Sequence, residues 1–265
     1  MRRRGARGVA TPFWPLLAIV QRAAPMMARL KLFIEPFAPR KVVRKWNAHA
    51  GIRRNYRQSP AELFGTIYRQ KHWGGDDHDF YSGSGSHTPE VIEPFIAAVR
   101  AYLAAFPTPP IVVDLGCGDF AVGSRLLDLA QHYWACDVVP ELIAQNRRLF
   151  AAPNLSFHVV DGVADPLPRG DIVIVKQVLQ HLRNDQISSI VRKLSQYPRW
   201  IISEHLPRGE FVPNRDKLAS GYTRLHLNSG VVLTEDPFRL EPKATEVLCE
   251  ALEGGGLIRT VAYRF

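Results

Sequence analysis

The stretch Val112–Asp119 reads VVDLGCGD and is the most informative part of the 265-residue sequence. The apolar run Ile111–Leu115 is typical of a strand that is buried on both faces of a parallel sheet. The glycines that follow let the backbone turn sharply and approach a ligand closely. Because Ala121–Ala130 has a helical pattern, the segment is expected to form a strand, a turn and a helix.

Strands and helices continue to alternate after this unit. The expected strands are His132–Asp137, Leu155–Val160, Asp171–Lys176 and Trp200–Glu204, and the expected helices are Pro140–Phe150 and Asp185–Leu194. This order predicts an α/β fold with a doubly wound, Rossmann-like, mostly parallel sheet. In the last third of the chain, Ala244–Leu252 is expected to be helical and Leu257–Phe265 to form a terminal strand.

Two helices and a loop are expected before the sheet. The segment 59–70 begins with a serine N-cap, a proline at the first helical position and a glutamate three residues after the serine, which is a capping-box pattern. Apolar residues recur at helical spacing from Pro89 to Phe106. Between these helices lies the polar, glycine-rich loop His72–His87, which is either a lid over a bound ligand or, equally well, a flexible surface loop.

Charge divides the chain into two parts. Residues 1–58 carry 14 Lys and Arg against one acid, whereas the remaining residues carry 20 against 24. We therefore expect a basic, helical N-terminal extension over residues 1–58 and one domain over residues 59–265. Such an extension can attract nucleic acid or an anionic membrane surface, and it can equally be a targeting segment.

The pattern of apolar residues and cysteines favours a cytoplasmic protein that binds no metal. No run approaches the ~20 apolar residues of a membrane span, and the best one, Val9–Val20, is interrupted by two prolines. The three cysteines form no C-x-x-C pair, and the acids and histidines of the loop match no zinc pattern. The alternative locations are an organelle, or a peripheral membrane surface contacted through residues 1–58.

Candidate ligand-binding residues follow each strand of the expected core. In doubly wound sheets, ligands sit beyond the carboxyl ends of the strands. The residues at these ends are Asp114, Gly116, Gly118 and Asp119 after the first strand, Asp137 after the second, Asp161 and Gly162 after the third, and Lys176, Gln177 and His181 after the fourth. Polar groups from four strands are therefore expected to meet at one edge of the sheet.

Two kinds of ligand fit the first turn. Gly116-x-Gly118-x-x-Ala121 matches the dinucleotide fingerprint G-x-G-x-x-G/A, with Asp137 about 20 residues on as a ribose ligand. Asp119, however, adds a negative charge where a pyrophosphate needs bare backbone N–H groups and a positive helix end. A ligand with an ammonium, a sulfonium and no phosphate tolerates these acids, and S-adenosylmethionine is such a ligand.

In order along the chain, these motifs resemble those of the class I S-adenosylmethionine-dependent methyltransferases. The resemblance rests on DLGCGD between a strand and a helix, an aspartate after the second strand, VVDG at the third and DIVIVKQVLQHL at the fourth. It covers roughly Val91–Glu204 and implies S-adenosyl-L-methionine as the cofactor. Residues 59–106 would then form a helical and lid region, 107–204 the cofactor-binding core, and 205–265 the acceptor side with the last strands.

The resemblance also implies roles for the first two strand ends. Gly116 and Gly118 would line the methionine portion of the cofactor, and Asp114 would help to hold its amino group. Asp137 would accept both ribose hydroxyls, which a carboxylate can do in bidentate fashion. The alternative for Asp137 is a solvated loop acid.

At the third and fourth strand ends, the same resemblance implies contacts with the adenine and the sulfonium. Asp161 would lie beside the adenine amino group, with Gly162 near the ring. Lys176 or Gln177 would border the sulfonium. The alternative for the Asp-Gly pair is an ordinary turn.

Methyl transfer from an activated donor depends largely on alignment, and a base is needed only when the acceptor carries a proton. His181 and His205 follow the fourth and fifth strands and are candidate bases, because histidine exchanges protons near neutral pH. The alternative for each is a structural role. In the lid loop, Tyr81 and Ser84 are candidates for contacting the carboxylate of the donor.

The expected function is methyl transfer to an unidentified acceptor, a small molecule or a lipid-linked metabolite. The alternatives are methylation of protein or nucleic acid, a nucleotide-dependent oxidoreductase, and a non-catalytic methyltransferase-like module that binds a partner. The acidic core and the absence of an N-P-P-Y or D-P-P-Y tetrapeptide after the fourth strand disfavour a nucleic-acid acceptor. Beyond the fifth strand, candidate acceptor contacts, which fit equally well as surface residues, are Tyr222, Arg224, His226 and Asn228.

Overall fold

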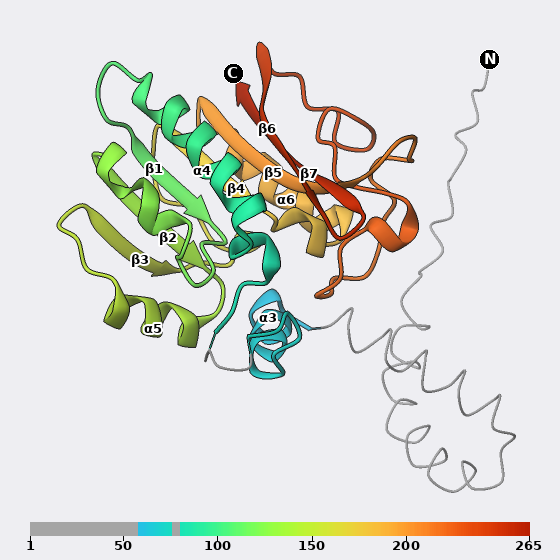
Figure 1. Ribbon diagram of the computed structural model, residues 1–265, viewed down its shortest axis with the longest axis horizontal. Helices are drawn as coiled ribbons and strands as arrows, with labels where there is room; N and C mark the ends of the chain where they lie inside the picture. The colour runs from blue at the N-terminus through green and yellow to red at the C-terminus, as the bar shows by residue number, and fades with distance from the viewer. Residues whose placement is uncertain (1–57, 76–79) are drawn as a thin grey trace, which may run out of the picture. The chain divides into compact units, whose positions relative to one another are not determined.

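The computed structural model describes residues 58–75 and 80–265 (Figure 1). Its core is a seven-stranded sheet in the order β3-β2-β1-β4-β5-β7-β6. The parallel strands are β1 (Ile111–Leu115), β2 (His132–Asp137), β3 (Leu155–Val159), β4 (Ile172–Lys176) and β5 (Arg199–Pro207). Strand β7 (Gly256–Arg264) runs antiparallel between β5 and β6 (Ala244–Glu253). The predicted Rossmann-like α/β fold is therefore confirmed.

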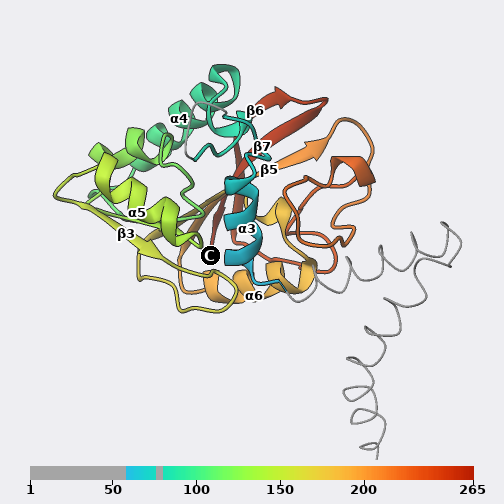
Figure 2. The ribbon, with the colours of Figure 1, turned by 90° about the horizontal axis from the view of Figure 1, so that it is seen from below.

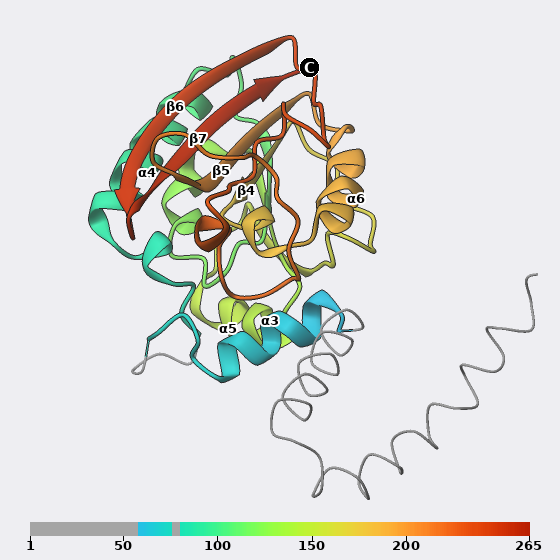
Figure 3. The same ribbon diagram turned by 90° about the vertical axis from the view of Figure 1, so that its right-hand side faces the viewer.

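Helices cover both faces of the sheet. Helices α4 (Pro89–Ala104) and α6 (Asn184–Leu194) lie on opposite sides of it (Figure 3). Successive residues of a strand point to opposite faces, so Ile172 and Ile174 pack in the cluster under α4, and Val173 and Val175 in the cluster under α6. The continuous apolar run of β4 is thus explained by burial on both sides.

The remaining helical elements flank the core. Helix α3 (Pro60–Arg69) has the predicted capping box: Ser59 N–H donates to Glu62 Oε2 (3.0 Å), and Glu62 N–H donates to Ser59 Oγ (3.3 Å). From below, α3 is seen between α4 and α6 (Figure 2). The others are α5 (Pro140–Leu149) and the 3₁₀ turns η2 (Ser84–Ser86), η3 (Gly123–Leu129), η4 (Leu179–His181) and η5 (Leu225–Leu227). In place of the expected helix Ala121–Ala130, the chain forms the shorter 3₁₀ turn η3.

The helix expected at Ala244–Leu252 is wrong, because these residues form β6. Alanine, leucine and glutamate favour helices when isolated, but here hydrogen bonding to β7 and packing of Leu248 and Cys249 in the α4 cluster override that preference. Gly254 and Gly255, both with positive φ, form the two-residue hairpin turn. This Gly-Gly pair between two apolar segments is the sequence signal for the hairpin.

The described residues contain no helix that is long and apolar enough to cross a membrane. The helical extension expected at residues 1–58 lies outside the described residues, except for its last residue.

Candidate active site

A cavity of about 400 Å³ lies at the carboxyl edge of the parallel strands. The predicted site residues that line it are Asp114, Gly116, Gly118, Asp137, Asp161, Gly162, Lys176, Gln177, Ser84, His181 and His205. Tyr81 is not among the described lining residues, and its ring stacks on that of His87 with the centroids 4.3 Å apart. The sheet topology therefore brings eleven of the twelve predicted residues to one cavity.

The glycine turn after β1 is held by close packing and by a buried amide. Gly116 and Gly118 both have positive φ, +84° and +55°. The N–H of Gly118 donates to Asp137 Oδ2 (3.1 Å), and its carbonyl accepts from Asn146 Nδ2 (2.7 Å). Asn146 on α5 is fully buried and was not identified from the sequence. These contacts orient the turn towards the cavity.

Two buried carboxylates stand at the ends of β1 and β2. Asp114 Oδ2 accepts a hydrogen bond from the Tyr133 hydroxyl (3.0 Å), and Asp137 Oδ1 accepts from Val139 N–H (3.1 Å). Burial raises the pKa of Asp114 to about 7 and that of Asp137 to about 6. Each oxygen has a second lone pair, so both groups can still accept hydrogen bonds from a ligand.

The Asp161-Gly162 pair forms a turn at the cavity wall. Asp161 Oδ1 accepts from the N–H groups of Val163 (2.8 Å) and Ala164 (3.3 Å), which is an Asx-turn. Both residues of the pair nevertheless line the cavity. The turn geometry and a ligand contact are compatible, and the adenine role stays a prediction.

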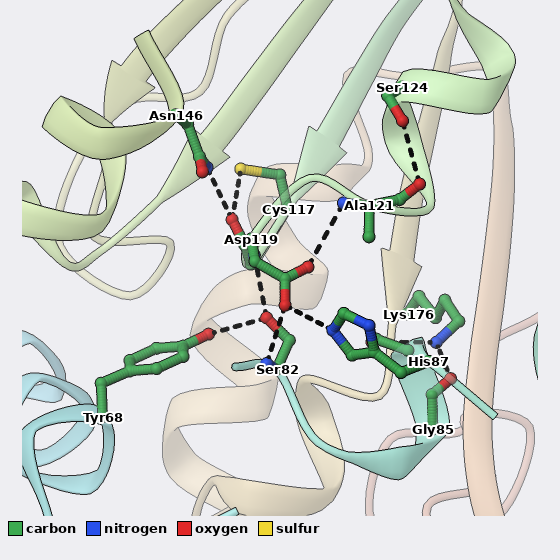
Figure 4. Close-up of polar contacts among 12 residues, drawn as sticks. Tyr68, Ser82, Gly85, His87, Cys117, Asp119, Ala121, Ser124, Asn146 and Lys176 are labelled. Atoms are coloured by element: carbon green, nitrogen blue, oxygen red, sulfur yellow. Dashed lines mark hydrogen bonds and ion pairs between the residues drawn. The ribbon is translucent and has the colours of Figure 1, made fainter. Parts of the chain in front are cut away.

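Residues 82–87, which we call the strap, cross the carboxyl edge and are anchored by Asp119 (Figure 4). The Asp119 carboxylate accepts from Ser82 N–H (2.9 Å) and pairs with His87 Nε2 (2.6 Å). In return, Asp119 N–H donates to Ser82 Oγ (2.8 Å). Burial tends to raise the pKa of Asp119, but the hydrogen bond and charge of His87, together with backbone N–H groups, hold that pKa below its ordinary value.

Lys176 anchors the strap from the end of β4. Its Nζ donates to the carbonyl of Gly85 (2.6 Å), to Ser86 Oγ (3.4 Å) and to Gln177 Oε1 (2.9 Å). Burial lowers the pKa of Lys176 to about 8, although nearby carboxylates, of which Glu253 acts most strongly, oppose the shift. All three ammonium protons thus have partners within the protein.

The two candidate bases occupy different settings. His181 Nδ1 lies 3.2 Å from the Ser220 carbonyl and Nε2 lies 3.3 Å from Gln180 Nε2, so both ring nitrogens have protein partners. Burial lowers the pKa of His181 to about 3, which makes it a weak base. His205 Nε2 donates to the Glu253 carbonyl (2.9 Å), which leaves Nδ1 as the acceptor. The catalytic roles of His181 and His205 stay predictions.

The hairpin between β6 and β7 contributes a residue that the sequence did not identify. Glu253 lines the cavity, and its Oε1 accepts a short hydrogen bond from the Ser84 hydroxyl of the strap. Its Oε2 lies 3.9 Å from His205 Nδ1. With Ala244–Leu252 interpreted as a helix, nothing placed Glu253 at the carboxyl edge. As the last residue of β6 it pairs with Gly256 of β7, which on its other side pairs with Pro207 at the end of β5.

Aromatic side chains form the wall opposite the sheet. Phe64 and Tyr68 of α3 and Trp73 of the following loop line the cavity, and α3 also packs Ile67 into the core. Trp73 lies 6.1 Å from Phe64 and 5.2 Å from the ring of His181, centroid to centroid. Its indole N–H donates to the Gly221 carbonyl (2.9 Å), which fixes the ring in place.

The side chains of Glu204 and Arg224 form hydrogen bonds with the backbone of the segment after β4. Glu204 accepts from Leu179 N–H (3.0 Å) and Gln180 N–H (2.9 Å), and burial raises its pKa to about 8. Arg224, fully buried, donates to the oxygens of Arg215, Leu179, Gln180, Leu182 and Asn184. Arg224 is therefore a structural clamp and not one of the acceptor contacts.

The residues present fit S-adenosylmethionine better than a dinucleotide. Among the described residues that line the cavity, five carry carboxylates and one, Lys176, carries an ammonium. Buried acids at Asp114 and Asp137 suit an ammonium and two hydroxyls, whereas a pyrophosphate would meet Asp119 at the turn. No group of three or more histidine, cysteine or acidic residues within 58–75 and 80–265 is arranged to hold a metal.

Comparisons with known proteins agree with this geometry. Residues 112–198 match a family model described as a methyltransferase domain. The fold is similar to magnesium protoporphyrin IX methyltransferase from Synechocystis PCC 6803 with bound S-adenosylhomocysteine, at 16% identity over 76% of this chain and 95% of that chain, TM-score 0.51. It is also similar to N-methyltransferase NodS from Bradyrhizobium japonicum WM9, at 13% identity over 76% and 97%, TM-score 0.55. No curated protein sequence matches the chain.

Proposed function

We propose that this chain, which carries a methyltransferase domain, is a class I S-adenosylmethionine-dependent methyltransferase that transfers methyl groups to a small organic acceptor. The donor supplies a methyl group on a sulfonium that is already activated for displacement. The protein's task is then to hold the donor, align the acceptor and exclude water.

Each of these tasks can be assigned to residues of the cavity. Asp114 would hold the amino group of the donor and Asp137 its ribose hydroxyls. The strap, anchored by Asp119 and Lys176, would separate the donor from water. An acceptor would enter beside Trp73 and His205, which line the same cavity.

The observation that carries the proposal is that one cavity is lined both by the residues predicted to bind the donor and by residues with no predicted donor role, among them Phe64 and Trp73. The size of the cavity is within the ~300–1,000 Å³ range of small-molecule sites. The strap crosses the cavity, so a polymer would have to displace it. The excess of carboxylates also opposes an approaching nucleic acid.

Calorimetry tests the donor site. We expect S-adenosylmethionine and S-adenosylhomocysteine to bind with micromolar dissociation constants and NADH not to bind. Asp137→Ala should weaken both sulfur ligands at least about tenfold, roughly 1.4 kcal/mol. Glu141→Gln, which removes an exposed carboxylate from the adjacent helix, should not change either constant. A folded protein that binds neither sulfur ligand would support a non-catalytic, partner-binding module instead.

Transfer of tritium from methyl-labelled donor into a cell extract tests the acceptor class. We expect the label in the small-molecule fraction and its absence from protein and nucleic acid. Label that is recovered mainly in protein or in nucleic acid would overturn the small-acceptor proposal while leaving the donor site intact.

A further inference from the structure

One wall of the cavity combines aromatic rings with a carboxylate. We call it the acceptor wall and define it by Phe64, Trp73, Gln180, His181, His205 and Glu253, all of which line the cavity. Aromatic rings stand at one end of it and a carboxylate at the other. This combination bears on what the acceptor is.

The two ends are joined by a continuous series of contacts. The ring of Trp73 packs on that of His181. His181 Nε2 lies 3.3 Å from the side-chain amide of Gln180, and Gln180 Oε1 accepts from the backbone N–H of His205 (3.0 Å). His205 Nε2 in turn donates to the Glu253 carbonyl (2.9 Å). The rings and the carboxylate therefore belong to one surface.

The carboxylate of Glu253 has capacity for a ligand. Oε1 accepts from Ser84, and Oε2 is 3.9 Å from His205 Nδ1, beyond hydrogen-bonding distance. The side chain is 15% exposed, so a ligand in the cavity can reach it while most of the surrounding water is excluded. A hydrogen bond to a charged partner is strongest in such a setting.

Lys176, the lysine among the described lining residues, has no N–H to spare for an anionic acceptor. Lys176 uses its three ammonium protons on the strap and Gln177. The described lining includes no arginine, and Arg224 is fully buried among five oxygens. Five carboxylates against one ammonium leave the cavity negative even after the donor, which carries one net positive charge, has bound.

We propose that the acceptor is an amine on an aromatic or similarly planar apolar group, with its ammonium bound by Glu253 and its ring against Trp73 and Phe64. The proposal rests on the methyltransferase function. Ring–ring and cation–π contacts stabilise such a ligand at one end, and a charge-assisted hydrogen bond does so at the other.

The reaction on such an acceptor balances as follows. The ammonium first gives one proton to Glu253, which passes it to water. The neutral amine nitrogen then forms a bond to the methyl carbon while the carbon–sulfur bond breaks and its electron pair stays on sulfur. The product leaves as a methylammonium ion together with neutral S-adenosylhomocysteine.

Three probes of similar shape separate an amine from other acceptors. We would measure the binding of 2-phenylethylamine, 2-phenylethanol and 3-phenylpropanoate by calorimetry at neutral pH, to the full chain saturated with S-adenosylhomocysteine. The amine should bind at least about tenfold more tightly than the alcohol, and the carboxylate most weakly. Tritium from methyl-labelled donor should appear in the amine.

Matched variants assign the preference to one carboxylate. Glu253→Gln can still accept the hydrogen bond from Ser84 but carries no charge, so amine affinity should fall about tenfold, to that of the alcohol. Glu250→Gln removes a carboxylate from the same strand, where it pairs with Arg259 outside the described lining, and should keep the amine preference. Trp73→Phe should weaken the amine and the alcohol alike.

Two results would overturn the proposal in a protein that still binds S-adenosylhomocysteine: no binding of the amine, or binding of the carboxylate as tight as that of the amine. Persistence of the amine preference in Glu253→Gln would overturn the assignment to this residue. A failure of S-adenosylhomocysteine itself to bind would instead remove the methyltransferase function on which the proposal rests.

Discussion

Gly118 meets two steric demands at the first turn. Its φ is +55°, and a Cβ built on it would lie 2.3 Å from Ser82 Oγ of the strap. Gly209 has a φ of +76° with nothing within 4 Å of such a Cβ. Alanine in place of Gly118 would therefore meet both backbone strain and overlap with the strap, whereas alanine in place of Gly209 would meet only the strain.

Gly118→Ala should weaken S-adenosylhomocysteine binding at least about tenfold and lower the free energy of unfolding by ~2–4 kcal/mol, since strain and overlap add. Gly209→Ala should cost only the strain, ~1–2 kcal/mol, and leave binding unchanged. Calorimetry and urea unfolding of both variants provide the comparison. Equal loss of affinity in the two would show that overlap with the strap is irrelevant.

The buried acids Asp114 and Asp137 make donor binding depend on pH. Burial raises their pKa values to about 7 and about 6, above those of an unfolded chain. Their contribution to stability is therefore fully present below the unfolded pKa and is lost as the pH rises through these values. A bound ammonium and hydroxyls favour the ionised acids and oppose this loss.

The affinity for S-adenosylhomocysteine should consequently rise as the pH increases from about 5 to about 8. Asp114→Asn should bind more weakly and show a shallower dependence on pH, because one of the two titrating groups is gone. Calorimetry across this range measures both effects. An affinity of the wild-type chain that is independent of pH contradicts the assignment of these acids to the donor.

At the scale of the elements, charged side chains from three other segments hold the strap in position. Asp119 after β1, Lys176 on β4 and Glu253 on β6 each hold one part of it. The sequence of the strap has almost no helical or strand pattern of its own, and the regular structure within the strap is the short turn η2. Its closure is therefore set by side-chain hydrogen bonds.

Asp119→Ala removes the acceptor for Ser82 and His87 and should release one end of the strap. We expect S-adenosylhomocysteine to dissociate about tenfold faster, ~1.4 kcal/mol, with a smaller effect on association. Stopped-flow fluorescence measures both rates. Asp128→Ala, an exposed acid paired with Arg100, is the control and should not alter them. Unchanged dissociation in Asp119→Ala would falsify the retaining role of the strap.

The segment after β4 depends on Arg224 in a comparable way. Its guanidinium donates to the carbonyls of Leu179, Gln180 and Leu182, and the Leu179 carbonyl also accepts from Leu182 N–H (3.0 Å). Arg224→Lys cannot reproduce this fork geometry and should lower the free energy of unfolding by ~2–4 kcal/mol. Arg239→Lys, in an exposed pair with Asp236, should leave the free energy of unfolding unchanged. Urea unfolding measures the free energy of unfolding of both variants. Equal losses in the two would contradict the role of Arg224 as a structural clamp.

At the scale of the whole molecule, the basic excess and the residues of the candidate active site lie in different parts of the chain. The described residues that line the cavity all lie at or beyond Pro60, whereas the basic excess lies in residues 1–58. We therefore expect a chain that lacks residues 1–57 to bind S-adenosylhomocysteine within about twofold of the full chain.

The full chain should co-sediment with phosphatidylserine vesicles at low salt and dissociate at high salt, because screening weakens the attraction of basic residues to an anionic surface. Neutral phosphatidylcholine vesicles are the control. Equal vesicle binding by the truncated chain would place the membrane contact in the methyltransferase domain and not in the extension.

Short-range patterns were sufficient to predict β1 to β5, α3, α4 and most of the residues that line the cavity at the ends of the parallel strands. A parallel strand that is buried on both faces appears in the sequence as a continuous apolar run. Turns and helix caps are recognised from residue types only a few positions apart. Because parallel strands all end at one edge, Asp114, Asp137 and Lys176 could be grouped before any contact was known.

Only the tertiary structure showed that Glu253 and Trp73 line the cavity and that Arg224 holds the segment after β4. β6 is a strand because β7 and α4 pair with it and pack on it, so its helix-favouring composition misled the sequence pattern. Trp73 and Arg224 lie in irregular segments, which lack the hydrophobic periodicity that predicts helices and strands. Their hydrogen-bond partners are also distant in sequence. The residues predicted to bind the donor thus follow from local chemistry. The proposed acceptor wall depends on long-range pairing and packing, which no short stretch of sequence encodes.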